Sequence, residues 1–267
     1  MFIHFTFSEL AKQGQIEEQA NCVIEKILKE KRLKASECPE FVPLFPDTRG
    51  VRITYGEPRV SGDTVVLPIT NEVPERNITY LPCDVKMLCF IKTSFSQLST
   101  SPHSQQYGKF GIALTDNFLR GKGIKPVEYY SEKSVWTNPL IKKWNYYARN
   151  HLYPEKHKEL QDEIVNYRKP ATLFPSFRKL TTIQINRTAD ELTARRYTYN
   201  RYPEGYDFRK EKEWRIIFNK GKDYLYFDEG DLFMVITPDS KVKRKIETFL
   251  SQNWNKQPRI EEFPISS

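Results

Sequence analysis

The sequence predicts an α+β fold, built on a mixed, mostly antiparallel central sheet with a helical insertion. Short apolar runs of strand length occur near both ends and in the middle of the chain, with amphipathic helical stripes between them. The strands do not alternate regularly with helices, which argues against a parallel βαβ fold. No sequence period recurs along the 267 residues, which excludes solenoids and propellers.

The first third of the chain predicts a strand, a helix and a hairpin. Residues 2–7 alternate between apolar and polar types, as a strand with two different faces does. Apolar residues then recur at three- and four-residue spacing over 16–28, the stripe of an amphipathic helix. Two β-branched segments, 51–55 and 64–69, flank the turn at Ser61-Gly62-Asp63 and predict a hairpin or two nearby strands.

The rest of the chain predicts further strands and two helical regions. The region 138–169 is helical with a break at Pro154, and a final amphipathic helix covers 242–254. We expect one domain over 1–267, with a hairpin insertion at about 49–70 and a helical insertion at about 138–169. The expected strands are 87–91, 110–114, 127–130, 213–218, 224–227 and 233–236.

The composition is that of a soluble, basic chain. It has 42 Lys and Arg against 34 Asp and Glu, a net charge of +8. No apolar run approaches the roughly 18 residues that span a bilayer, and the N-terminal segment lacks the pattern of a signal peptide. We therefore expect a cytoplasmic protein with no membrane partner.

Cysteine and histidine usage does not indicate a metal site. The four cysteines form no C-x-x-C pair, so we expect buried, reduced thiols, and the four histidines lack the H-E-x-x-H spacing. Phosphate-binding loops of the G-x-x-x-x-G-K-[ST] and G-x-G-x-x-G types are also missing from the sequence. What remains is a set of scattered polar residues.

The first candidates are His4 and Thr6. Side chains two apart on a strand point the same way, so both should lie on the face opposite Phe5 and Phe7. A histidine there can donate to a ribose hydroxyl or a ligand carbonyl. The alternative is an ordinary histidine with its hydrogen bonds satisfied at a strand end.

A second group is Glu211, Glu213 and Arg215. If the strand already starts at Glu211, the three side chains share one face while Trp214 packs on the other. When two carboxylates are neighbours, the pKa of one can be raised so that it acts in acid–base catalysis. Alternatively, one of them can bind a sugar hydroxyl and stabilise a cationic transition state. The alternative is a surface ion-pair ladder with Arg215.

Three other segments carry candidate binding residues. Tyr107 precedes two glycines, which allow close approach of a ligand or a backbone, and its ring can stack on a flat ligand. Ser94 lies in a hydroxyl-rich turn after a buried strand. Cations and aromatics alternate at Arg195, Arg196 and Arg201, a composition that suits nucleic-acid phosphates and bases but is also common on solvated surfaces.

Taken together, several blocks resemble the abortive phage infection family AbiGi. They are Ile3-His4-Phe5-Thr6, Cys89-Phe90, Tyr107-Gly108-Lys109-Phe110-Gly111-Ile112 leading to Gly123-Ile124-Lys125-Pro126-Val127-Glu128-Tyr129, and Glu211-Lys212-Glu213-Trp214-Arg215-Ile216. The resemblance implies a role in bacterial phage defence as the antitoxin of a two-gene pair. It also implies a protein partner, either a cognate toxin or a phage protein.

A second resemblance is to the ADP-ribosyltransferases that bind NAD, which share a His-x-Thr on the first strand, a hydroxyl-bearing turn and a late Glu. It implies that His4 holds the adenosine ribose side, Tyr107 stacks on nicotinamide and Glu213 steadies the oxocarbenium-like state. Thr6, Ser94 and Glu211 would support them. Here the Ser-Thr-Ser motif is replaced by Thr93-Ser94-Phe95-Ser96.

Three functions are therefore expected. The first is transfer of ADP-ribose from NAD to a protein or nucleic acid, with Glu213 and Glu211 catalytic. The second is a non-enzymatic antitoxin or sensor that binds a partner protein. The third is a nucleic-acid-binding module that depends on Arg195, Arg196 and Arg201. The first requires that His4 and Glu213 line one shared cleft.

Overall fold

The computed structural model describes residues 1–6, 14–44, 60–61, 64–65, 79–100, 108–150, 154–171, 206–219 and 221–264. The chain divides into two compact units, each assembled from separate stretches of sequence. Unit 1 comprises Met1–Ser36, Lys86–Val127 and Arg209–Ser267, and unit 2 comprises Glu37–Val85 and Glu128–Phe208. The prediction of one domain over 1–267 stays a prediction.

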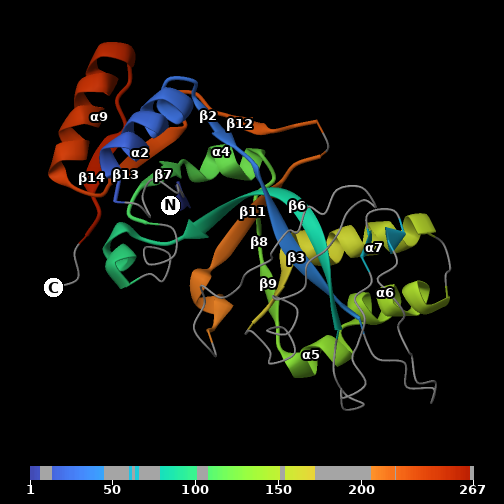
Figure 1. The fold of residues 1–267 in the computed structure, drawn as a ribbon. Helices are drawn as coiled ribbons and strands as arrows, with labels where there is room; N and C mark the ends of the chain where they lie inside the picture. Colours follow the sequence, from blue (N-terminus) through green and yellow to red (C-terminus); the bar gives the residue numbers. More distant parts are fainter. Residues whose placement is uncertain are drawn as a thin grey trace. The chain divides into compact units, whose positions relative to one another are not determined.

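The sheet of unit 1 has the order β14-β13-β7-β1-β6-β11-β8 (Figure 1). All of these neighbours are antiparallel except β13 and β14. The strands are β1 (Phe2–Phe5), β6 (Thr79–Lys92, from Lys86 on in this unit), β7 (Gly111–Leu114), β8 (Lys125–Pro126), β11 (Glu213–Ile217), β13 (Leu232–Thr237) and β14 (Arg259–Glu262). The predicted mixed, mostly antiparallel sheet is therefore confirmed.

Apolar side chains cover both faces of this sheet. On one face, Phe2 and Phe90 join a large core with residues of α2 (Ile16–Val23), α4 (Asp116–Gly121) and α9 (Ser240–Asn253). In α9, Val242, Ile246 and Leu250 recur every four residues and are all buried, which is why this segment is an amphipathic helix. On the other face a smaller core contains Ile3, Ile91 and Leu98, the last from η2 (Phe95–Thr100). Because the strands contribute side chains to both cores, their sequences are nearly continuous apolar runs.

Gly111 marks a close approach within the sheet. A Cβ added there would lie 3.0 Å from Ile3 Cγ2 and 3.5 Å from Ile236 Cδ1. The strands on either side, β1 and β13, both pair with β7 at this residue. The glycine therefore serves packing of the core rather than access for a ligand.

A two-stranded ribbon, β2 (Arg32–Lys34) with β12 (Tyr224–Tyr226), belongs to the same unit. Its central pair, Leu33 and Leu225, is buried in the large core. Two further backbone hydrogen bonds, from Ala35 N to Asp223 O at 2.8 Å and from Phe227 N to Lys31 O at 3.0 Å, extend the pairing at both ends. Burial of its inner face fixes the ribbon, since an isolated two-stranded hairpin is marginally stable.

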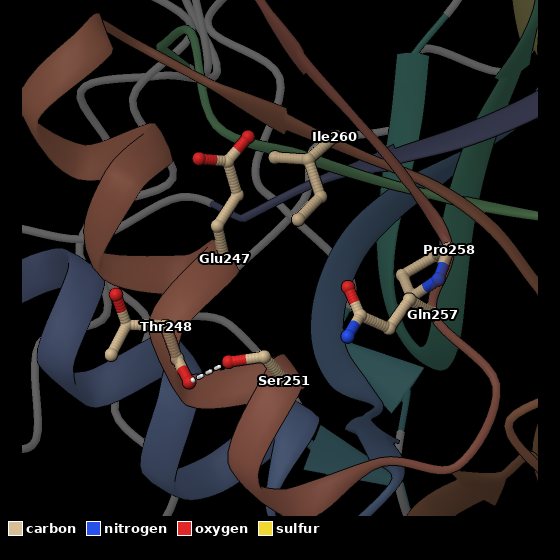
Figure 2. Close-up of a pocket in the computed structure, with 6 residues that line it drawn as sticks. All are labelled: Glu247, Thr248, Ser251, Gln257, Pro258 and Ile260. Carbon is tan, nitrogen blue, oxygen red and sulfur yellow. Dashed lines mark hydrogen bonds between the residues drawn. The ribbon is translucent and has the colours of Figure 1, made fainter.

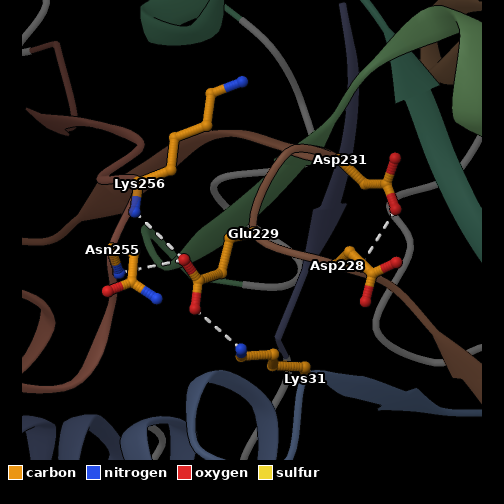
Figure 3. Close-up of polar contacts among 6 residues, drawn as sticks. All are labelled: Lys31, Asp228, Glu229, Asp231, Asn255 and Lys256. Carbon is orange, nitrogen blue, oxygen red and sulfur yellow. Dashed lines mark hydrogen bonds and ion pairs between the residues drawn. The ribbon is translucent and has the colours of Figure 1, made fainter.

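Glu229 links the start of this ribbon to the segment after α9 (Figure 3). Its Oε1 accepts a 2.7 Å hydrogen bond from Lys31 Nζ, and its Oε2 accepts 3.0 Å bonds from the backbone N–H groups of Asn255 and Lys256. Lys31 has a left-handed backbone, φ 49°, and its Nζ lies 5.3 Å from the centre of the Trp254 ring. One carboxylate thus connects two segments that are far apart in sequence.

Unit 2 contains the predicted helical region. α6 (Pro139–Asn150) and α7 (Pro154–Tyr167) form it, and Pro154 begins α7 as a first-turn proline can. A further helix, α5 (Glu132–Thr137), precedes the predicted region. β3 (Ser36–Leu44) pairs with β6, and β9 (Glu128–Tyr130) pairs in parallel with β10 (Arg168–Pro170). Buried Asn145 donates to Pro43 O at 3.0 Å, which joins α6 to β3 inside this unit.

Two local predictions are met only in part. β4 (Val60–Ser61) pairs antiparallel with β5 (Thr64–Val65), within the predicted second strand, while the predicted strand at 51–55 and residues 66–69 lie outside the described residues. The four cysteines form no disulfide, as expected, but each is half-buried rather than fully buried.

Candidate functional site

The most unusual polar group of unit 1 is a buried ion pair on β11. Arg215 Nε donates a 2.8 Å hydrogen bond to Glu213 Oε1, and the two side chains are 0% and 6% exposed. They share a face because residues two apart on a strand point the same way. Burial of a guanidinium is expensive unless a carboxylate accompanies it, and Glu213 supplies such a carboxylate to Arg215.

Glu211 does not belong to β11, although a strand starting at Glu211 was considered from the sequence. β11 begins at Glu213, not at Glu211, which ends the single-turn η3 (Phe208–Glu211). Lys212, between the two glutamates, has a left-handed backbone with φ 46°, so the alternation of faces does not extend back to Glu211. Glu211 is nevertheless 2% exposed. The alternative of an ion-pair ladder with Arg215 is correct in pairing Glu213 with Arg215, but it is wrong in placing the carboxylates on the surface, because both are buried.

His4 lies on β1 with its ring tilted against Phe90, ring centres 5.6 Å apart. Its Nδ1 is 2.9 Å from Cys89 O, and since a carbonyl can only accept, Nδ1 carries the proton. Removal of the ring from water lowers the pKa of His4 below 6.5, and the hydrogen bond to Cys89 offsets part of this effect. His4 is therefore a histidine whose described hydrogen bond is to the backbone of the neighbouring strand.

The register of the sheet separates His4 from Glu213. Ile3 pairs with Ile91 of β6, and Ile91 pairs in turn with Glu213 of β11. Paired residues share a face and successive residues alternate, so Glu213 lies on the face of Ile3 and His4 lies on the other. The packing of the two cores is consistent with this assignment of faces. Ile3 and Ile91 pack in the small core, whereas His4 packs against Phe90, which belongs to the large core. The structure does not bring the two side chains into one cleft.

Thr6 and Ser94 have local roles. Thr6 is buried, its N–H donates to Phe110 O at 3.0 Å, and its carbonyl accepts a 2.7 Å hydrogen bond from Gln19. Ser94 is exposed, and its Oγ lies 3.1 Å from Ser96 Oγ at the start of η2. Tyr107, Arg195, Arg196 and Arg201 lie outside the described residues.

One open pocket lies in unit 1, between α9 and the segment leading into β14 (Figure 2). Glu247, Thr248 and Ser251 line it from the helix, and Gln257, Pro258 and Ile260 from the other side. Its described lining contains a carboxylate and no cation, which does not suit the phosphates of a dinucleotide. None of the predicted site residues lines it.

The β2–β12 ribbon has a polar face that was not predicted from the sequence. Tyr224 pairs with Lys34 and Tyr226 with Arg32, and all four side chains lie on the face away from the buried leucines. The alternation Tyr-Leu-Tyr-Phe already indicates that Tyr224 and Tyr226 share a face. That Arg32 and Lys34 lie beside them follows only from a pairing between residues nearly two hundred positions apart in the chain.

No helix among the described residues has the length and apolar character needed to cross a bilayer. No cluster of three or more His, Cys, Asp or Glu within the described ranges has the arrangement of a metal site.

Comparison with known proteins identifies a family. A family model described as "Putative abortive phage resistance protein AbiGi, antitoxin" matches residues 81–256, more than half of the chain. The match runs from within β6 to just beyond α9, so it includes β11 with Glu213 and Arg215 but not β1 with His4. No curated protein and no solved structure matches the chain significantly. The chain belongs to the AbiGi family.

Proposed function

We propose that this protein acts in bacterial phage defence as an antitoxin that binds a partner protein, either a cognate toxin or a phage protein. The observation that carries the proposal is the family match over 81–256. That range contains β6, β7, β11 and β13 of the sheet in unit 1 together with α9. The matched sequence is therefore a folded framework rather than a short motif.

The described geometry supports binding better than group transfer. Glu213 is held by Arg215 inside the fold, and a carboxylate in such a pair maintains structure. His4 lies on the opposite face of the sheet and bonds to Cys89 O. The described sheet does not place the two side chains on one face, whereas chemistry on NAD would need them in one shared cleft.

Expression of the adjoining gene in the source genome tests the proposal. That gene is induced alone and together with this chain, and growth and co-elution of the two products are measured. We expect growth arrest by the adjoining gene alone, relief on co-expression and a stable complex. Growth arrest caused by this chain alone, with no relief of any neighbour's toxicity, would contradict an antitoxin role.

ADP-ribose transfer from NAD, on an ADP-ribosyltransferase-like core, is the alternative. In that proposal Glu213 and Glu211 are catalytic, and His4, Thr6, Ser94 and Tyr107 bind NAD. Incubation of the purified protein with labelled NAD, with and without cell extract, tests it. Turnover abolished by Glu213→Gln, in a variant shown to be folded, would favour the enzyme over the antitoxin; we expect no turnover.

A further inference from the structure

The outer face of the β2–β12 ribbon combines two tyrosines with two cations. Its inner face is buried, with Leu33, Ala35, Leu225 and Phe227 at 5% exposure or less. Tyr226 by contrast is 60% exposed and Lys34 is exposed. The strict alternation fixes Arg32, Lys34, Tyr224 and Tyr226 on one outward surface, which we call the tyrosine face.

Contacts within the tyrosine face hold its rings in place. The Arg32 guanidinium carbon lies 3.9 Å from the centre of the Tyr224 ring and 6.0 Å from that of Tyr226. Arg32 Nη1 also donates to Tyr226 Oη at 3.4 Å, and the two ring centres are 6.1 Å apart. Arg32 is itself fixed by a 2.6 Å hydrogen bond from its Nε to Glu30. A surface ordered in this way loses little conformational entropy when a ligand binds.

Lys34 gives this surface an exposed cation beside its aromatic rings, which suits an anion with flat rings. Glu30 offsets the charge of Arg32, whereas Lys34 pairs with Tyr224 in the ribbon and projects into solvent. The whole chain carries +8. Exposed aromatic rings beside cations are the arrangement that binds unpaired bases by stacking and their phosphates by charge.

We propose that the tyrosine face binds single-stranded nucleic acid, with a base stacked on Tyr226 and a neighbouring phosphate held by Lys34. A single strand is favoured over a duplex because stacking on a side chain needs a base whose face is exposed. This inference is independent of the antitoxin role and of the arginines singled out in the sequence.

The first half of α9 is the competing anion-binding surface. Lys241, Arg244 and Lys245 are all exposed there, and Lys241 pairs with Glu17 of α2. This surface has charge but no described aromatic ring on its exposed positions, so it suits a phosphate backbone without selecting unpaired bases. Variants on the two surfaces therefore distinguish binding by base stacking on the tyrosine face from binding of a phosphate backbone on α9.

Fluorescence anisotropy with the full-length protein tests the proposal. The probes are a labelled oligodeoxythymidine of about 12 nucleotides, within the usual footprint of single-strand sites, and a duplex of the same length. We expect tighter binding of the single strand. Tyr226→Ala should weaken it by about 5- to 100-fold, while Tyr226→Phe, which keeps the ring, should retain most of the affinity.

Two controls are matched to these variants. Tyr146→Ala removes a tyrosine of α6 that is also 60% exposed, and should leave affinity unchanged. Lys34→Ala should reduce the slope of log affinity against log salt by about 0.7, the value for one phosphate contact with a single strand. Lys34→Glu should weaken binding far more than Lys142→Glu, which changes the net charge equally at an exposed lysine of α6.

The proposal is overturned by any of three results. The first is no measurable binding of the single strand at low salt. The second is binding that survives Tyr226→Ala but is lost in Arg244→Ala with Lys245→Ala, which would assign it to α9. The third is loss of partner-protein binding in Tyr226→Ala with unchanged oligonucleotide affinity, which would make this face a protein interface.

Discussion

His4 and Glu213 lie on opposite faces of one sheet. Ile91 of β6 pairs with Ile3 on one side and with Glu213 on the other, so Glu213 shares the face of Ile3, and His4, the next residue after Ile3, points to the other face. Each side chain has a local partner: Cys89 O for His4 and Arg215 for Glu213. The function of the protein is therefore better sought on its surfaces than between these two residues. Four predictions follow from particular contacts.

Glu213→Gln should destabilise the protein strongly. It removes the carboxylate charge that meets Arg215 Nε at 2.8 Å inside the fold, and breaking a buried ion pair costs about 3–5 kcal/mol. The double variant Glu213→Leu with Arg215→Met removes both charges and should be clearly more stable than Glu213→Gln. Denaturant unfolding of the three proteins measures this, and a wild-type-like midpoint for Glu213→Gln would refute the structural role.

Acid should destabilise the fold through His4. The folded state lowers the pKa of His4 below 6.5, so below that pH the unfolded chain binds a proton that the folded chain resists. Stability from this residue is thus present above about pH 6.5 and is lost as pH falls through 6.5 toward the folded pKa. His4→Asn, whose side-chain amide can still donate to Cys89 O, should flatten that part of the curve of Tm against pH. An identical curve for the variant would count against the prediction.

Glu229 should also contribute stability that is lost in acid, at a lower pH than for His4 and through loss of its negative charge. Lys31 foremost, then the backbone N–H of Lys256, lowers the pKa of Glu229 below 4.5. Its contribution is present above about pH 4.5 and is lost as pH falls through the folded pKa. Glu229→Gln should therefore have a lower Tm than the wild type at pH 7. The difference in Tm between the two proteins should become smaller at acidic pH. The control is Glu262→Gln, at an exposed carboxylate of β14, which should change Tm little.

Gly111→Ala should strain the centre of the sheet. The new Cβ would lie 3.0 Å from Ile3 Cγ2, and overpacking of this kind costs about 1–3 kcal/mol. Gly121→Ala is the matched control, because nothing lies within 4 Å of its added Cβ at the end of α4. We expect it to leave stability unchanged or raise it by less than about 1 kcal/mol. Calorimetric unfolding of both variants decides whether the packing at Gly111 is as tight as described.

Local patterns determined most elements of the fold. The apolar spacing of Val242, Ile246 and Leu250 predicted α9, and Pro154 correctly divided the helical region into α6 and α7. The alternation of Trp214 and Arg215 correctly put them on opposite faces of β11. These features depend on neighbours within a few residues, which a sequence displays directly.

The sequence by itself determined the family, the sheet-and-helix character and which residues share a face within each strand. Only the tertiary structure decided which faces of different strands coincide, because the pairing register depends on contacts between distant segments, and a shift by one residue reverses every side chain. Such a shift between β1 and β6 would have brought His4 to the side of Glu213. The same kind of distant pairing placed Arg32 and Lys34 beside Tyr224 and Tyr226.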